Sequence, residues 1–243
     1  KNIVIVSRAR TPIGSFLGGL STLSAPELGS LAIKGALKKI NLDPATVSEV
    51  LMGQVVQAGA GQAPARQAAM GAGIPDHVPC TTVNKVCSSG LKAVMQGAQA
   101  IAMGDAEIVV AGGMESMSNI PHYLSMRQGQ KFGSASLRDG LQLDGLVDVY
   151  NQEVMGVFAE KCATKYGFSR DDQDEFAISS YERSAKAWSE GRFKDEVITV
   201  PVPQRRGDPK LIMEDEEFKN VRIDKIPKLR AAFVKEGTVT AAN

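Results

Sequence analysis

The sequence contains little histidine and little cysteine, with 2 His and 3 Cys among its 243 residues. Structural and catalytic zinc sites are built largely from these two residue types, and neither their number nor their spacing here matches such a set. An odd number of cysteines also disfavours a disulfide framework and indicates a reducing, intracellular compartment. The sequence therefore predicts neither a zinc protein nor a disulfide-bonded secreted one.

Long apolar runs and an excess of one charge are also lacking. No run approaches the ~20 apolar residues that a membrane-spanning helix requires, and no secretory signal precedes the first strand-like run, KNIVIVS. The formal net charge is +1, which provides no general attraction to nucleic acid or to a membrane surface. With 43% hydrophobic residues, the composition is that of a soluble globular protein, and neither nucleic acid nor a membrane is expected as a partner.

The chain divides near residue 118 into two stretches that differ in composition and in residue pattern. In the first stretch, short β-branched runs alternate with helix-like runs of small residues, which predicts an α/β layer with helices on both faces of a sheet. Strands are expected over residues 2–7, 49–56, 80–84 and 107–111, and helices over 25–40, 63–72 and directly after Cys87. The second stretch mixes aromatic, charged and glycine residues, and its pattern indicates a large excursion from the first domain. Its expected elements are helices over 152–166 and 170–191 and a strand followed by a turn in VPVPQRRGDPK, and the expected N-caps of the helices at 25–40 and 170–191 are Ser24 and Ser169.

Cys87 lies at the junction of a strand-like and a helix-like run, in TTVNKVCSSGLKAV. Near the N-terminus of a helix, free N–H groups and the helix dipole stabilise a thiolate, and they can bind the oxyanion that forms when the thiolate attacks a carbonyl. Residues 88–90 are small and allow a substrate to approach the backbone. This setting suits covalent acyl transfer, although a cysteine here can also be a small buried apolar residue. Cys80 and Cys162 lack such a setting and are interpreted as structural.

The segment NKVCSSG resembles the nucleophile signature of the thiolase family, N-x-x-C-[SA]-S-[GA]. Other segments follow in the family's order: RTPIGSFLGGL, GQAPARQA, VVAGGMESMSN, DGLVDVYN, DDQDEFAISSYERS and EGTVTAAN. The resemblance extends over nearly the whole chain and is greatest to the mitochondrial-type acetoacetyl-CoA thiolases of that family. It implies an α/β fold with a thiolase-like N-terminal βαβαβ core domain at residues 1–118 and an inserted loop domain, which covers the active site and holds CoA, at 119–236. Residues 237–243 then return to the core domain, and the family's C-terminal domain is absent from this sequence.

The resemblance implies acyl transfer through a thioester of Cys87, whose backbone N–H would bind the thioester oxygen. Cys87 would take the acetyl group of one acetyl-CoA, and a second acetyl-CoA would attack it to give acetoacetyl-CoA; the reverse reaction is thiolysis by CoA. The family's base histidine, an asparagine and a second cysteine have no matching motif here, and His77 and His122 lie outside it. The chain alone is therefore expected to hold a reactive cysteine without completing turnover. Because its sheet would lack a last strand, it is also expected to aggregate or to need a partner.

The resemblance also implies positions that contact the substrate and an ion. Met155 matches a residue of the acyl pocket, and Tyr181 matches one close to CoA and to a potassium ion. The implied CoA-contacting positions in the basic stretch FKNVRIDKIPKLR are Asn220, Arg222 and Lys225. Backbone carbonyls at Ala241 and Ala242 would share the potassium ion, a hard cation that oxygen ligands suit. No tightly bound cofactor is implied, since the CoA thioester is the substrate.

The same branch implies the mitochondrial matrix, lipid and ketone-body metabolism, and a homo-oligomer, dimer or tetramer, that associates through about residues 120–143. Several alternatives stay open. Val154 stands where short-chain members carry a histidine, which is compatible with a 3-ketoacyl-CoA thiolase for longer or 2-methyl-branched chains. A β-ketoacyl synthase shares the architecture but differs around the cysteine, and a catalytically incomplete CoA-binding fragment is a further alternative. A dinucleotide-binding enzyme is disfavoured because no G-x-G-x-x-G follows a strand.

Overall fold

The computed structural model describes residues 2–243, which form two compact units. The first unit runs to Gly145 and includes Asp195–Glu214, and the second comprises Leu146–Lys194 and Asp215–Asn243. The two units are groups of backbone segments that lie close together. The domain limits expected at residues 118 and 236 remain a prediction. None of the helices within residues 2–243 combines the length and the apolar character that a membrane-spanning helix needs.

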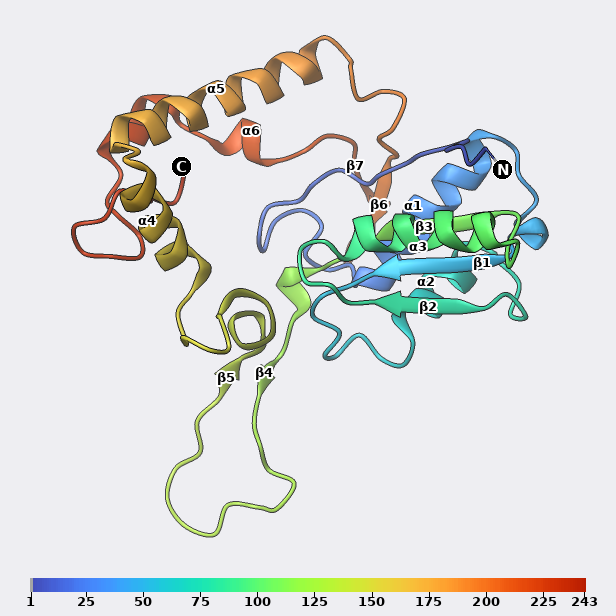
Figure 1. The fold of residues 1–243 in the computed structure, drawn as a ribbon, viewed down its shortest axis with the longest axis horizontal. Coiled ribbons are helices and arrows are strands. Elements are labelled where there is room, and N and C mark those ends of the chain that lie inside the picture. Colours follow the sequence, from blue (N-terminus) through green and yellow to red (C-terminus); the bar gives the residue numbers. More distant parts are fainter. Residues whose placement is uncertain (1) are drawn as a thin grey trace. The chain divides into compact units, whose positions relative to one another are not determined.

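A three-stranded parallel sheet in the order β2–β1–β3 lies at the centre of the first unit (Figure 1). The strands are β1 (Glu49–Gly53), β2 (Cys80–Val83) and β3 (Val109–Gly113). The helices are α1 (Ala25–Lys39), α2 (Pro64–Gly71) and α3 (Ser89–Met103). Gly53 pairs with Val83 on one side and with Gly113 on the other, so the three strands end side by side. The predicted α/β layering is confirmed, with β3 beginning slightly later than expected.

The side chains of β1 alternate between the two faces of the sheet. Val50 and Met52 are buried in one apolar cluster with Ile33 of α1 and Ala68 of α2. On the opposite face, the Cα of Gly53 approaches the start of α3 so closely that a Cβ there would lie 2.5 Å from the backbone nitrogen of Gly90. The helices α1 and α2 therefore cover one face and α3 the other. Full burial of such aliphatic side chains contributes about 1.5–3 kcal/mol each, so this cluster is the main source of the unit's stability.

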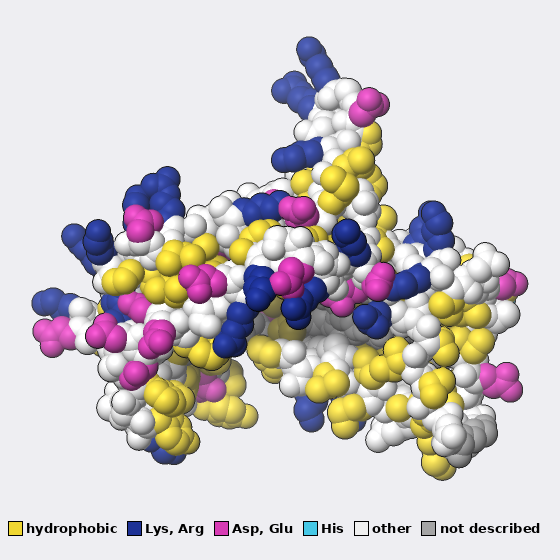
Figure 2. Space-filling view, turned by 90° about the horizontal axis from the view of Figure 1, so that it is seen from above, with side chains coloured by type: hydrophobic (Ala, Val, Ile, Leu, Met, Phe, Trp, Pro, Cys, Tyr) yellow, Lys and Arg dark blue, Asp and Glu magenta, His cyan; other side chains and the backbone are white. Residues whose placement is uncertain are grey.

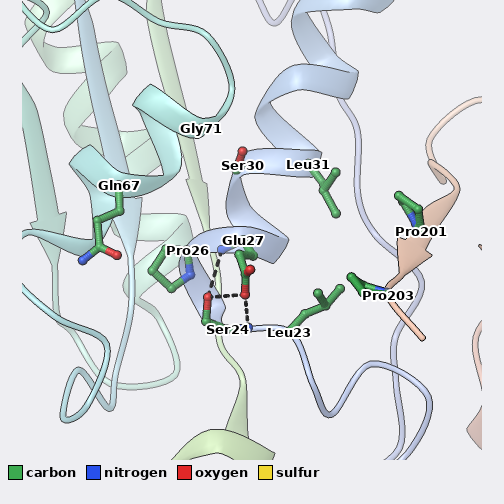
Figure 3. Close-up of a pocket in the computed structure, with 10 residues that line it drawn as sticks. All are labelled: Leu23, Ser24, Pro26, Glu27, Ser30, Leu31, Gln67, Gly71, Pro201 and Pro203. Atoms are coloured by element: carbon green, nitrogen blue, oxygen red, sulfur yellow. Dashed lines mark hydrogen bonds between the residues drawn. The ribbon is translucent and has the colours of Figure 1, made fainter. Parts of the chain in front are cut away.

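Helix α1 begins where the sequence predicts. Ser24 Oγ accepts a hydrogen bond from the N–H of Glu27, and the Glu27 carboxylate accepts one from the N–H of Ser24 at 2.8 Å, which together form a capping box. Figure 3 shows this cap beside a hollow of about 580 Å³ that is lined by residues of α1, α2 and the segment around β6 (Val200–Val202). None of the site residues expected from the sequence lines this hollow.

Residues 2–7, which were predicted to form a buried strand, form none. Their side chains are largely exposed, with 70% exposure at Val4 and 81% at Ile5. They border a groove of about 390 Å³ whose other walls are α1, α3 and the outer edge of β3. Within residues 2–243 no strand pairs with that edge. The prediction is wrong because an apolar, β-branched run becomes a strand only when a neighbouring strand accepts its hydrogen bonds, and composition does not report a missing neighbour.

The remaining elements of the first unit are short. They are the 3₁₀ turns at Pro44–Thr46 and Met117–Asn119, the hairpin of β4 (His122–Tyr123) with β5 (Arg138–Asp139), and β6 with β7 (Lys210–Ile212). A π-helical turn follows β5 at Gln142–Leu146. The pair of β6 and β7 corresponds to the strand and turn predicted in VPVPQRRGDPK, and its Val200 and Val202 are buried against Leu20 and Leu23.

The second unit contains the two helices expected there, α4 (Met155–Tyr166) and α5 (Arg170–Ser189). Two short elements follow, α6 (Glu217–Asn220) and the 3₁₀ helix η4 (Ile223–Lys228). As predicted, Ser169 caps α5, and Arg170 joins the unit together: it pairs with Asp174 at 2.8 Å and donates to the carbonyls of Ile226 and Leu229, both at 3.0 Å. Figure 2 shows Lys and Arg side chains interspersed with Asp and Glu across the face in view, in keeping with a formal charge of +1.

We predict that Gly53→Ala destabilises the protein whereas Gly112→Ala does not. The new Cβ at position 53 would lie 2.4 Å from the carbonyl carbon of Ser89, while at position 112 it would meet only Met52 Sδ at 3.5 Å. Replacing glycine stabilises by about 0.4–1 kcal/mol through the unfolded chain, but overpacking costs about 1–3 kcal/mol. Urea unfolding of both variants measures the difference. Equal stability of the two would contradict the close contact between β1 and α3.

Candidate active site

Cys87 lies in the connection from β2 to α3, at the edge where the parallel strands end. Ligands of parallel α/β sheets bind at this carboxyl edge. The thiol is free and exposed, whereas Cys80, within β2, is half-buried and burial raises the pKa of its thiol. The strand–helix junction that the sequence indicates is therefore present, and it exposes Cys87 on the side of the sheet that suits ligand binding.

Val86, the residue before Cys87, has a φ of 49° in the left-handed region, which β-branched residues rarely adopt. Its N–H donates to Asn84 Oδ1 at 3.0 Å. Its carbonyl accepts from Ser89 Oγ at 2.6 Å and from the Ser89 N–H at 3.0 Å. A strained backbone of this kind costs about 1–3 kcal/mol and persists only where its surroundings hold it. The side chains of Asn84 and Ser89 therefore fix the turn that exposes Cys87.

The first turn of α3 lies directly against the ends of the central strands. A Cβ on Gly113 would lie 3.2 Å from the Cα of Gly90, a tight contact, so a side chain there would push β3 and the helix apart by a few tenths of an ångström. Ser88, at the N-cap of α3, makes no side-chain capping hydrogen bond. The first N–H groups of a helix have no partners within it, and with the dipole they form an end that accepts negative charge. This charge-accepting end begins next to Cys87.

Glu115 follows β3 at the same edge and was not among the residues expected from the sequence. Its Oε2 accepts from the N–H groups of Val55 at 2.8 Å and Val56 at 3.3 Å. Its Oε1 is buried without a hydrogen-bond partner among residues 2–243, as is Oε1 of the neighbouring Gln54. Burial raises the pKa of Glu115, against the lowering effect of the hydrogen bonds from the N–H groups of Val55 and Val56. The available sequence signal was an acidic residue soon after a buried strand, in VVAGGMESMSN.

The expected CoA-contacting and acyl-pocket residues lie in the second unit. Met155 is the first residue of α4 and is 46% exposed, and the ring of Phe233 packs against the adjacent Gly156 so closely that no Cβ fits there. Tyr181 is half-buried on α5. Asn220, at the end of α6, and Arg222 and Lys225, around η4, are all exposed. Cys87, by contrast, belongs to the first unit.

Ala241 and Ala242 lie in a turn that is anchored to α5. Thr240 Oγ1 accepts from the N–H of Ala242 at 3.1 Å, and Asn243 Nδ2 donates to Asp174 Oδ1 at 2.6 Å. Asp174 and Tyr181 are seven residues apart in α5 and therefore share a face of it. The expected ligand atoms, two backbone carbonyl oxygens and the phenol oxygen of Tyr181, are all oxygens, and a hard cation prefers oxygen ligands. Within the described part of the chain, no group of His, Cys, Asp and Glu is arranged to hold a metal ion.

Neither histidine accompanies Cys87. His77 is exposed and precedes β2, so it lies at the amino edge of the sheet, opposite the edge where Cys87 lies. His122 is exposed in the β4–β5 hairpin. This placement agrees with the interpretation that neither residue belongs to the family's histidine motif.

Comparison with known proteins gives one family. Residues 3–243 match the model of the N-terminal domain of thiolases. An acetyl-CoA acetyltransferase of Schizosaccharomyces pombe is 54% identical over 99% of this chain and 62% of its own length. The mitochondrial acetyl-CoA acetyltransferase of Homo sapiens is 52% identical over 100% of this chain and 57% of its own. A cytosolic acetyl-CoA acetyltransferase of Gibberella zeae is 51% identical, with 99% and 61% covered.

The solved structures include the Acat5 thiolase from Ascaris suum in complex with coenzyme A. It superimposes with a TM-score of 0.89 at 44% identity, covering 96% of this chain and 59% of that one. The present chain thus spans about three-fifths of the length of the relatives it matches.

We predict that Glu115→Gln alters the pH dependence of stability. Because burial raises the pKa of Glu115 above its usual 4.5, the folded protein keeps the proton at a pH where the unfolded chain has lost it. The resulting stabilisation is complete below the unfolded pKa and is lost as pH rises through the folded value. Glutamine resembles the protonated acid, so the stability of the wild type should fall relative to Glu115→Gln as the pH rises above 4.5.

Urea unfolding over this pH range measures the effect, with Glu107→Gln, at an exposed carboxylate just before β3, as the control. If the two glutamine variants kept the same difference from the wild type at every pH, the burial of the Glu115 carboxylate would be wrong.

Proposed function

The chain belongs to the thiolase family, and on that premise we propose that it carries the acyl-accepting part of an acetyl-CoA C-acetyltransferase. The observation that supports this role most is the exposed Cys87 on a strained turn at the charge-accepting end of α3. The names of relatives at 50–54% identity over nearly the whole chain support acetyl-CoA as the substrate. The Ascaris suum thiolase, whose structure contains coenzyme A, supports CoA as the carrier.

In the first step, the Cys87 thiolate attacks the carbonyl carbon of acetyl-CoA. A bond forms between Sγ and that carbon, the bond from the carbon to the CoA sulfur breaks, and CoA leaves with the proton that Cys87 gave up. Negative charge develops on the carbonyl oxygen between these events. The backbone N–H of Cys87 and the start of α3 are suited to stabilise it, as donors fixed before the reaction begins are the most effective.

In the second step, the methyl carbon of another acetyl-CoA attacks the acetyl group on Cys87. A base takes the methyl proton, the new carbon–carbon bond forms, and the bond to Cys87 Sγ breaks to release acetoacetyl-CoA; thiolysis by CoA is the reverse. The sequence contains no match to the family's base-histidine motif, and His77 lies at the opposite edge of the sheet. The proposal therefore assigns this chain the formation of the thioester and not the removal of the methyl proton.

The remaining roles in the proposal follow the resemblance. Arg222 and Lys225 would contact CoA phosphates beside Asn220, since both cations are exposed. Met155 would line the acyl pocket, and Tyr181 with the carbonyls of the 241–242 turn would hold potassium. A homo-oligomer, dimer or tetramer, is part of the same proposal. The likeness to the human protein supports the mitochondrial matrix, and the likeness to the Gibberella zeae protein supports the cytosol.

A wider acyl range is a second candidate. Val154, at the N-cap of α4, makes no side-chain capping hydrogen bond and places an apolar group directly before Met155. An apolar neighbour favours a longer or 2-methyl-branched acyl group over a polar contact with the substrate. Labelling of Cys87 by a longer or 2-methyl-branched acyl-CoA as fast as by acetyl-CoA would support this candidate, and labelling by acetyl-CoA alone would exclude it.

We predict that brief exposure of the chain to acetyl-CoA adds one acetyl group, seen by intact mass. Cys87→Ala should add none, because the acyl acceptor is gone. Cys162→Ala removes the other exposed thiol and should be acetylated like the wild type. An unmodified wild type, or an adduct that persists in Cys87→Ala, would show that Cys87 is not the acyl acceptor.

A further inference from the structure

The carboxyl ends of the three central strands are joined by two side chains. Glu115, after β3, accepts from the N–H groups of Val55 and Val56, which follow β1. Asn84, after β2, donates from Nδ2 to the carbonyl of Val55 at 3.0 Å. Its Oδ1 accepts the N–H of Val86 at 3.0 Å. These bonds form a continuous path from the end of β3 through Val55 to the residue that precedes Cys87.

The Val55 peptide is the central link of this path. The last N–H after β1 that pairs with β2 is that of Gln54, which donates to the carbonyl of Val83 at 3.0 Å, so Val55 lies beyond the sheet pairing. The N–H of Val55 donates to Glu115, and the carbonyl of Val55 accepts from Asn84. These two partners lie 60 and 29 residues away in the chain. A backbone segment fixed at both ends in this way acts as a rigid support for the side chain of Asn84.

The burial of the Glu115 carboxylate is unfavourable in free energy, and packing alone does not explain why a carboxylate lies there. Placing a carboxylate at this edge is unfavourable when one of its oxygens is buried and has no hydrogen-bond partner among residues 2–243, since buried polar groups are stable only when hydrogen-bonded. The turn at Val86 is costly as well, because its φ of 49° disfavours a β-branched residue. Two costs along one path that ends beside an exposed thiol indicate a role at that thiol.

We propose that Asn84 and Glu115 are positioning residues for Cys87, with Glu115 acting through Val55 and Asn84 to hold the Val86 turn that places the thiol at the start of α3. This inference rests on the proposed function, in which Cys87 is the acyl acceptor. Ser89 holds the other side of the same turn through its bonds to Lys85 and Val86. Glu115 touches neither Cys87 nor the reacting atoms and is therefore not a catalytic residue.

The test compares the three cysteines within one sample. Limiting iodoacetamide is added to the 243-residue chain, and peptide mass spectrometry gives the alkylation rates of Cys87, Cys162 and Cys80. Cys162 is an exposed thiol in the other unit and serves as the reference. Cys80 is half-buried in β2 and reacts faster only when the sheet opens. The ratio of Cys87 to Cys162 reports positioning, and Cys80 reports loss of structure.

Asn84→Ala and Glu115→Ala should each lower the ratio of Cys87 to Cys162 about tenfold without faster labelling of Cys80, because the thiol is displaced from the start of α3. Glu115→Gln keeps an oxygen that accepts from Val55 and Val56 and should restore most of the rate. Ser116→Ala is the matched control: it removes a 2.7 Å bond to the carbonyl of Leu23 beside Glu115 but no bond of the path, and its ratio should equal that of the wild type.

Four results would overturn the proposal. If the wild type shows a high ratio that both alanine variants retain, Cys87 is activated without the path, and only the positioning role fails. If the wild-type ratio is near one, Cys87 is not activated in this chain, and the proposed function fails with it. A fall in the ratio that is matched by faster labelling of Cys80, or that Ser116→Ala reproduces, would also contradict the proposal, because the effect would then be a general loss of structure.

Discussion

The close contact between the first turn of α3 and the ends of the central strands is the constraint on which the site depends. Gly53 of β1, Gly113 of β3 and Gly90 of α3 have no side chains, and a Cβ at these positions would lie between 2.4 and 3.5 Å from backbone atoms of the facing element. Because the helix can approach this closely, its N–H groups lie at the carboxyl edge of the sheet. The connection from β2 must then reach the helix within five residues. A left-handed residue, Val86, reverses the chain in that short distance, and Cys87 is the next residue.

The turn is stable because its strain is offset locally. A left-handed valine costs about 1–3 kcal/mol, and each hydrogen bond returns about 0.5–1.5 kcal/mol. Three such bonds, one from Val86 to Asn84 and two from Ser89, are of the right total size to hold it. Asn84 is fixed in turn by Val55, and Val55 by Glu115. The geometry at the thiol therefore depends on groups from the ends of all three strands, which explains why a buried carboxylate is tolerated where an apolar residue would be cheaper.

The sequence predicted those features that local chemistry determines. The caps Ser24 and Ser169, the helices that follow them and the junction at Cys87 are set by residues within a few positions of one another. Two other features could not be predicted, for different reasons. The apolar run at residues 2–7 has strand composition but no strand beside it among residues 2–243. Glu115 acquires its importance from Val55, 60 residues away, and no local pattern encodes that contact.

The central claim is that the junction itself, a strained turn against the start of α3, places Cys87 to accept an acyl group. A crystal structure of the chain after brief exposure to acetyl-CoA would test this claim most directly. The account predicts continuous density for an acetyl group on Cys87 Sγ, its oxygen within hydrogen-bonding distance of the Cys87 N–H, and Val86 still in the left-handed region. Density for the acetyl group on another side chain, or an acetylated Cys87 whose oxygen points away from the start of α3, would contradict it.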